Sequence, residues 1–155
     1  ILDGEMDKAS RMLGRRFSLR LKVEHGNCIG RLLDFPTINQ SFPRHHIVPR
    51  YGVYSTVVNV DGNLYGGVTN VGIKPTVGSD HPLAETFILD YSGDLYDRVV
   101  EVYFFRFVRP EVKFESIAQL KAQIARDKED VSGEVAQNIE KMLYPNLLTD
   151  ENDDF

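Results

Sequence analysis

Residues 26–39 combine glycines and side chains that could hold a phosphorylated ligand. Glycines such as Gly26 let main-chain N–H groups come close to phosphate oxygens, and Arg31 adds a positive charge. Thr37 and Asn39 offer neutral oxygens, which suit a hard cation such as Mg²⁺ that keeps most of its water and nucleotide ligands. The segment is therefore a candidate phosphate and magnesium site, although taken alone it also fits an ordinary loop.

Two further segments place polar groups in strand-like sequence. Residues 67–76 contain Asn70 and Gly72, which are candidates for a site or do no more than turn the chain. Glu85 lies near the start of the apolar run 84–90, where an inward-facing carboxylate could take a proton from a hydroxyl group. A solvated residue at the end of a strand is the alternative for Glu85.

The best-known chemical signatures are absent from the sequence. It contains no nucleotide P-loop, no dinucleotide-binding glycine motif, no serine-hydrolase elbow and no zinc-protease motif. Cys28, His25, His45 and His46 lack the spacing of zinc ligands, and one thiol is too few. We therefore predict no transition-metal site.

The composition is that of one ordinary globular domain. Of 155 residues, 42% are hydrophobic and 26% charged, which excludes a wholly disordered chain, a collagen-like chain and a disulfide scaffold. The single Cys28 cannot form an internal disulfide, and no apolar run reaches the roughly 18 residues that span a bilayer. We therefore expect a soluble, cytoplasmic protein. The net charge of -5 argues against nonspecific binding to a nucleic-acid backbone.

Hydrophobic periodicity predicts the elements that position these residues in the first third of the chain. Residues 5–13 have helical spacing and stop at Gly14, a C-terminal cap. Residues 17–23 alternate apolar and polar side chains, as in a strand with one buried face. Residues 26–50 contain two glycines and three prolines. We expect a long loop there, and a loop of that length in so small a domain indicates function.

Strand patterns dominate the middle of the chain. Residues 52–60 and 64–71 flank Asp61-Gly62, a dipeptide that favours a tight hairpin turn. Two further strands are expected over residues 85–91 and 99–108, which are rich in apolar, β-branched and aromatic side chains.

Helical periodicity returns only after Ser116, which forms a capping-box pattern with Gln119. Two apolar helical faces are expected, one of Ile117, Leu120 and Ile124 and the other, in a further helix, of Val135, Ile139, Met142 and Leu143. Because strands come first and helices last, the order indicates an antiparallel β-barrel or strongly curled sheet with C-terminal helices packed against it.

Read together, the motifs resemble those of riboflavin kinases in order and spacing. They extend over about residues 4–130 and comprise Phe35-Pro-Thr-Ile-Asn39, Gly52-Val-Tyr54, Val68 to Thr76, Glu85 to Asp90, Gly93-Asp-Leu-Tyr96 and Val108 to Phe114. The chain looks most like the C-terminal kinase module of bacterial bifunctional riboflavin kinase/FMN adenylyltransferases, or FAD synthetases. The resemblance implies a mainly β fold, a six-stranded antiparallel Greek-key-like β-barrel with one or more C-terminal helices.

The resemblance also implies a division of the chain. Residues 1–15 would be the connector from an N-terminal adenylyltransferase module that this sequence does not contain, and which would be the partner in cis. Residues 16–130 would be the riboflavin kinase domain, and residues 131–155 a C-terminal helix and acidic tail. The same expectation would explain a chain that begins at Ile1 rather than Met.

The implied reaction transfers the γ-phosphoryl group of ATP to the ribityl 5′-hydroxyl of riboflavin, giving FMN and ADP. By resemblance, Glu85 would be the general base, and Thr37 and Asn39 would hold the Mg²⁺ that accompanies ATP. The other implied contacts are, for ATP, Gly26, Arg31, Ile88, Asp90 and Tyr96 and, for the flavin, Arg109, Val112 and Phe114. Phosphoryl transfer depends on placement and on neutralising negative charge, which Mg²⁺ and N–H groups can do in a net-negative protein.

Three residues depart from the family pattern. Asp34 stands where the family usually has Gly, Arg20 replaces another common Gly, and Val112 stands where some relatives have Lys. A carboxylate at Asp34 would weaken ATP binding or have to turn outward.

The alternative function is therefore a noncatalytic flavin- or nucleotide-binding β-barrel. A barrel for single-stranded nucleic acid suits the topology but not the charge.

Overall fold

The computed structural model describes residues 1–26, 37–76 and 79–145. In these ranges, six antiparallel strands form one sheet in the order β1-β6-β3-β4-β5-β2. The strands are β1 (Ser18–Lys22), β2 (Thr37–Ser41), β3 (Gly52–Val60), β4 (Asn63–Thr76), β5 (Ser79–Ile88) and β6 (Val99–Arg109), preceded by helix α1 (Met6–Leu13) and followed by α3 (Ile117–Leu143). The predicted mainly β fold with a C-terminal helix is confirmed.

The sheet curls until its two edge strands nearly meet. An antiparallel bridge links Glu24, just after β1, to Asn39 on β2, and the Glu24 N–H donates to the Asn39 carbonyl at 2.8 Å. Inside the barrel, the fully buried Gln40 donates through Nε2 to the carbonyls of Leu21 and Val100, both at 2.9 Å. The Ser41 hydroxyl also donates to Glu24 Oε2 at 2.6 Å. A backbone bridge, a buried amide and this hydroxyl therefore hold the barrel seam, which we define as residues 21–24 of the β1 side and 39–41 of β2.

Strand β2 lies inside the segment that we predicted to be a loop, so that prediction is wrong for Thr37–Ser41. The strand has only five residues, and Gln40 occupies a core position where sequence patterns require an apolar side chain. Barrel carbonyls accept from the NH₂ of this buried amide, while its Oε1 has no hydrogen-bond partner within the described residues. The local sequence does not reveal these long-range contacts.

The turn and cap residues behave as the sequence predicts. Gly14, after α1, has a φ of 66°, the left-handed conformation of a helix C-terminal cap. Asp61 and Gly62 have φ values of 52° and 88°, as a tight turn between β3 and β4 requires, and the Gly62 N–H donates to Asn59 Oδ1 at 2.8 Å.

Helix α3 is one uninterrupted helix of 27 residues, not the two that we predicted. The Ser116 hydroxyl caps its start by accepting from the Gln119 N–H at 3.2 Å. The charged stretch in its middle does not end it, because Val131 and Val135 continue the buried face there.

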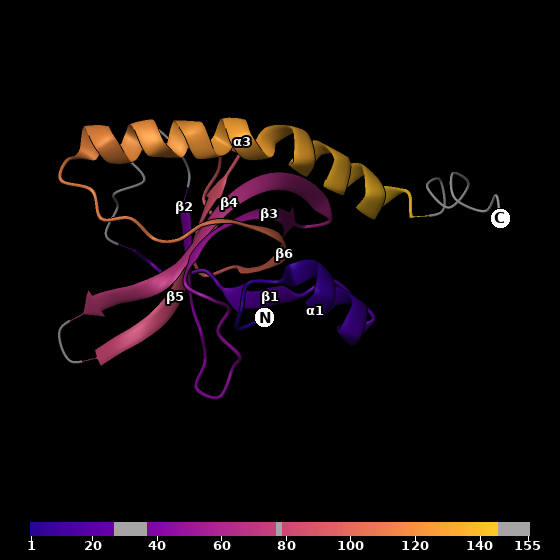
Figure 1. The fold of residues 1–155 in the computed structure, drawn as a ribbon, viewed down its shortest axis with the longest axis horizontal. Helices are drawn as coiled ribbons and strands as arrows, with labels where there is room; N and C mark the ends of the chain where they lie inside the picture. The colour runs from indigo at the N-terminus through magenta and orange to yellow at the C-terminus, as the bar shows by residue number, and fades with distance from the viewer. Residues whose placement is uncertain (27–36, 77–78, 146–155) are drawn as a thin grey trace.

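Two apolar layers hold the molecule together. One fills the barrel, with Tyr54, Phe104 and Val102 fully buried in it. The other lies between the barrel and α3, which runs across one face of the barrel (Figure 1). A Cβ on Gly66 of β4 would lie 2.4 Å from Val135 Cγ1, so glycine at that position lets the helix approach the strand closely.

Candidate active site

Strand register brings the candidate catalytic residues into one row across three strands. Glu85 on β5 lies opposite Asn39 of β2 on one side and opposite Asn70 of β4 on the other. Directly opposed residues of antiparallel strands share a face, with Cβ atoms about 4.5–5.5 Å apart. Thr37 precedes Asn39 by two residues on β2 and so points to the same face. Strand β2 therefore meets the β4–β5 hairpin, which follows it much later in the sequence, at one place.

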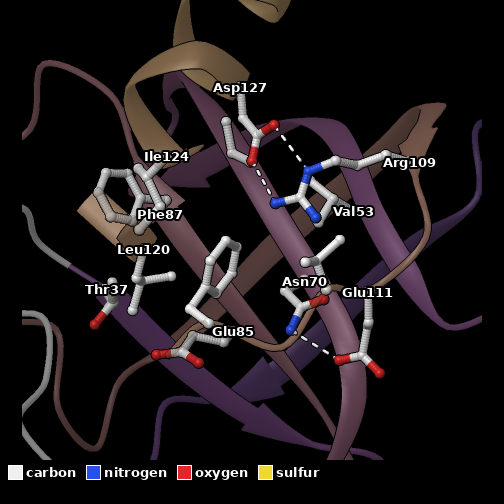
Figure 2. A pocket seen from close by; sticks show the side chains of 13 residues that line it. Thr37, Val53, Asn70, Glu85, Phe87, Arg109, Glu111, Leu120, Ile124 and Asp127 are labelled. Carbon is white, nitrogen blue, oxygen red and sulfur yellow. Dashed lines mark hydrogen bonds and ion pairs between the residues drawn. The ribbon is translucent and has the colours of Figure 1, made fainter. Parts of the chain in front are cut away.

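A pocket lies between this row and the first turns of α3 (Figure 2). The hydroxyl of Thr37 and the carboxylate of Glu85 lie near each other on one side of the pocket. Apolar side chains from three strands and the helix form much of the wall, namely Val53, Val68, Phe87, Leu120 and Ile124. The pocket thus joins a polar end, suited to proton transfer, to an apolar body, suited to a flat ring.

The pair of neutral oxygens on β2 fits a hard cation. Asn39 Oδ1 is buried and has no hydrogen-bond partner within the described part of the chain. Thr37 lines the same pocket. A Cβ on Gly26 would lie only 2.1 Å from Asn39 Nδ2, so glycine there lets the main chain close against the amide. Amide and hydroxyl oxygens are ligands that Mg²⁺ accepts when water and phosphate oxygens complete its shell.

The His, Cys, Asp and Glu side chains of residues 1–26, 37–76 and 79–145 form no cluster of the kind that ligates a metal ion. No group of three or more His, Cys, Asp or Glu residues in these ranges could hold a metal ion. The neutral oxygens of Thr37 and Asn39, with oxygens of a ligand and of water, are the candidate ligands for a cation at this end of the pocket.

The opposite end of the pocket carries an ion pair between β6 and α3. Arg109 Nε and Nη2 donate to the two carboxylate oxygens of Asp127 at 3.0 and 2.7 Å (Figure 2). Gln123 also donates to Asp127 Oδ1 at 3.0 Å, and Arg109 Nη1 donates to the Pro110 carbonyl at 3.1 Å. Both members of the pair line the pocket, and Arg109 is a residue that the sequence predicts as a flavin contact.

The segment after β6 crosses the pocket beside β4. Asn70 Nδ2 donates to Glu111 Oε1 at 3.0 Å. A Cβ on Gly72 would lie 2.0 Å from the same oxygen, so the carboxylate packs directly on this glycine. Val112 and Phe114, the other predicted flavin contacts, also line the pocket.

The remaining predicted nucleotide contacts do not line this pocket. The Ile88 side chain is 1% exposed and belongs to the barrel core, so only its main chain could meet a ligand. Asp90 is exposed at the end of β5, 3.8 Å from Lys128 Nζ. Tyr96 stacks on His25, the residue before Gly26, with ring centroids 4.2 Å apart.

Arg31 and Asp34 lie outside the described residues, so the effect of Asp34 on the phosphate loop stays a prediction. Among the charged residues that line the pocket, Glu111 and Asp127 are the two to which the sequence assigns no role. Asp127 occurs in a run of charged residues that is typical of a solvated helix face, and nothing in that run indicates its burial.

The fold and the pocket together define a small antiparallel β-barrel protein with a pocket between the barrel and its C-terminal helix. Residues 13–134 match the family model "Flavokinase: Riboflavin kinase". The chain belongs to the riboflavin kinase family.

Curated relatives agree with this assignment. Bifunctional riboflavin kinase/FMN adenylyltransferases from Listeria monocytogenes and Pseudomonas fluorescens are 33% and 41% identical over 131 and 124 residues, which are 84% and 79% of this chain. The enzyme of the same name from Escherichia coli K12 is 36% identical over 129 residues. These alignments cover 42%, 40% and 41% of the relatives, so the chain spans about two fifths of their length.

A solved structure shares the fold. The crystal structure named as a macrolide-efflux protein from Streptococcus pneumoniae has 33% sequence identity and a TM-score of 0.76, covering 83% of this chain and 42% of that one. Within the ranges described for this chain, no helix is both long enough and apolar enough to cross a membrane.

Proposed function

We propose that this chain is a riboflavin kinase module that transfers the γ-phosphoryl group of ATP to the ribityl 5′-hydroxyl of riboflavin, giving FMN and ADP. Membership of the riboflavin kinase family supports the reaction class. The observation that carries the proposal is the strand register that pairs Glu85 with Asn39, because it brings a carboxylate of the pocket beside the neutral oxygens of β2, of which Thr37 also lines the pocket.

Glu85 is the general base of the proposed reaction. A primary hydroxyl is a weak nucleophile while protonated, and a positioned carboxylate contributes roughly 10² to 10⁴ in rate by accepting the proton as the new bond forms. The hydroxyl oxygen bonds to the γ-phosphorus, the bond from that phosphorus to the β,γ-bridging oxygen breaks, and ADP leaves with the electron pair. The proton of the hydroxyl passes to the Glu85 carboxylate.

Thr37 and Asn39 would hold the Mg²⁺ that accompanies ATP, because one offers a hydroxyl in the pocket and the other a buried oxygen without a described partner. When bound, this ion neutralises charge on the phosphate oxygens. Gly26 has no side chain, and its main chain packs against the Asn39 amide. The main-chain N–H groups would therefore be able to approach phosphates bound next to that amide.

The apolar body of the pocket would take the isoalloxazine ring. Phe114 and the flat guanidinium of Arg109 are suited to contact a planar ring. With the ring at the end near Arg109, the ribityl chain would extend towards Glu85. We further propose that the module works in cis with an N-terminal FMN adenylyltransferase module, as the names of the relatives indicate for those proteins.

Chromatographic detection of FMN tests the proposal. The chain, mixed with riboflavin, ATP and Mg²⁺, is expected to form FMN, and Glu85→Gln is expected to lower the rate roughly 10² to 10⁴-fold. Glu115→Gln, in the exposed segment before α3, is the matched control and should retain the parent rate. Flavin binding without FMN formation at any Mg²⁺ concentration would reject the proposal.

A further inference from the structure

We propose that Asp127 is a positioning residue for flavin recognition, which fixes the guanidinium of Arg109 in the pocket wall that the ring contacts. This inference rests on the proposed function, because it assigns the end of the pocket near Arg109 to the ring. Asp127 lies on α3, far in the sequence from the Thr37, Asn39 and Glu85 positions.

Two arginines of β6 face a series of acids on α3. Arg109 forms the bidentate pair with Asp127 described above, which we call the inner pair. Arg106 donates through Nε to Glu134 at 2.7 Å and through Nη2 to Asp130 at 3.3 Å, which we call the outer contacts. The two sets connect the same strand to the same helix, so each serves as a reference for the other.

The inner pair and the outer contacts differ in how far their side chains are buried and in whether they line the pocket. The Asp127 side chain is 5% exposed and that of Arg109 is 20% exposed, and both line the pocket. In the outer contacts, Arg106 is 44% exposed, Asp130 56% and Glu134 28%, and none of the three lines the pocket. Exposed ion pairs contribute little, typically below about 1 kcal/mol, and their loss is tolerated.

A stability role alone does not account for the inner pair. Burying two charges costs desolvation energy that their attraction recovers only in part, so an apolar pair of similar volume often serves a core equally well. What a bidentate pair supplies is orientation, because the planar guanidinium must match both carboxylate oxygens. Its contacts to Asp127 and to the Pro110 carbonyl use three of the five N–H groups, so the orientation of the guanidinium plane is fixed before a ligand arrives.

The test uses lumiflavin, which has the isoalloxazine ring but no ribityl chain. Binding of lumiflavin and of riboflavin is measured by quenching of flavin fluorescence in the full chain, and KM for ATP is measured separately. Asp127→Asn keeps the shape but places an amide NH₂ against one guanidinium nitrogen. It is expected to weaken binding of both flavins on the order of tenfold and to leave KM for ATP unchanged. Asp130→Asn, the matched control in the exposed outer contacts, is expected to bind both flavins as the parent does.

Parent-like lumiflavin affinity in Asp127→Asn would overturn the inference, as would an equal rise in the flavin dissociation constant and in KM for ATP. Failure of the parent chain to bind lumiflavin would also overturn it. If Asp127→Asn does not fold, Asp127→Glu replaces it, because it keeps Arg109 and leaves no buried charge alone, while the longer side chain shifts the guanidinium. A folded Asp127→Glu protein with weakened lumiflavin binding supports the inference, and unchanged binding refutes it. Ring binding by a parent chain that forms no FMN would instead reject the kinase proposal alone.

Discussion

Replacing Gly26 by alanine tests whether the main chain beside β2 positions the Asn39 amide. Among the described contacts, a Cβ at this position would lie 2.1 Å from Asn39 Nδ2 and 2.9 Å from its Cγ. Ordinary van der Waals contact between a carbon and such an atom begins at about 3.5 Å, so the Asn39 amide would have to move by more than roughly 1 Å. Gly26 does not require a positive φ, so alanine creates this contact without straining the backbone.

The displaced amide would carry its Oδ1 away from the position proposed for Mg²⁺. A misplacement of about 1 Å at a reacting centre can cost on the order of 10²-fold in rate. Gly26→Ala is therefore expected to form FMN about 100-fold more slowly at a fixed Mg²⁺ concentration and to require more Mg²⁺ for its half-maximal rate. Lumiflavin binding should not change, because the ring is assigned to the other end of the pocket.

The assay is FMN formation across a Mg²⁺ titration, with thermal unfolding as a check on the fold. Gly133→Ala is the matched control. It lies within α3, where a Cβ would have no atom within 4 Å apart from its chain neighbours and the backbone of its own helix. Alanine favours a helix over glycine by up to about 1 kcal/mol. A folded Gly26→Ala protein with the parent rate and the parent Mg²⁺ dependence would refute the reasoning.

Two further predictions concern stability. Gly66→Ala is expected to lower the free energy of unfolding by about 1–3 kcal/mol, because the new Cβ would meet Val135 Cγ1 at 2.4 Å; an unchanged midpoint in denaturant would contradict this. Burial raises the pKa of Tyr54 to about 12, against the opposing charge of Arg50, so between pH 10 and 12 the unfolded chain loses a proton that the folded state keeps. The stability contributed by this shift is complete below pH 10 and is lost as the pH rises to 12. Tyr54→Phe should therefore lose less stability than the parent over that range in denaturant unfolding, and equal losses would show that Tyr54 does not titrate in this way.

The parts of the fold that the sequence predicts correctly depend on local chemistry. The turn at Asp61-Gly62 follows from the positive φ angles that this dipeptide accepts, and the end of α1 follows from Gly14. The errors occur where distant contacts decide the outcome. Gln40 enters a strand because carbonyls of β1 and β6 accept from its amide NH₂, and α3 stays continuous because its middle packs on the barrel.

In the candidate site, too, local chemistry is predictable from the sequence and long-range contacts are not. Thr37, Asn39 and Glu85 have side chains that indicate their chemistry, and the family resemblance linked them before any geometry was known. Their meeting in one row depends on a register between β2 and β5 that no local pattern determines. Asp127 was missed because its burial depends on Arg109, which lies 18 positions earlier in the chain.

The seam of the barrel has a consequence for motion. Asn39 contributes its backbone to the bridge with Glu24 and its side chain to the proposed metal site, while β3 and β4 are paired along nine consecutive positions. Segments with few backbone hydrogen bonds open at the lowest free-energy cost. Transient opening of this barrel would therefore begin at the seam, where magnesium is proposed to bind. A bound nucleotide would stabilise the closed seam, and amide hydrogen exchange would slow there before it slowed in the rest of the sheet.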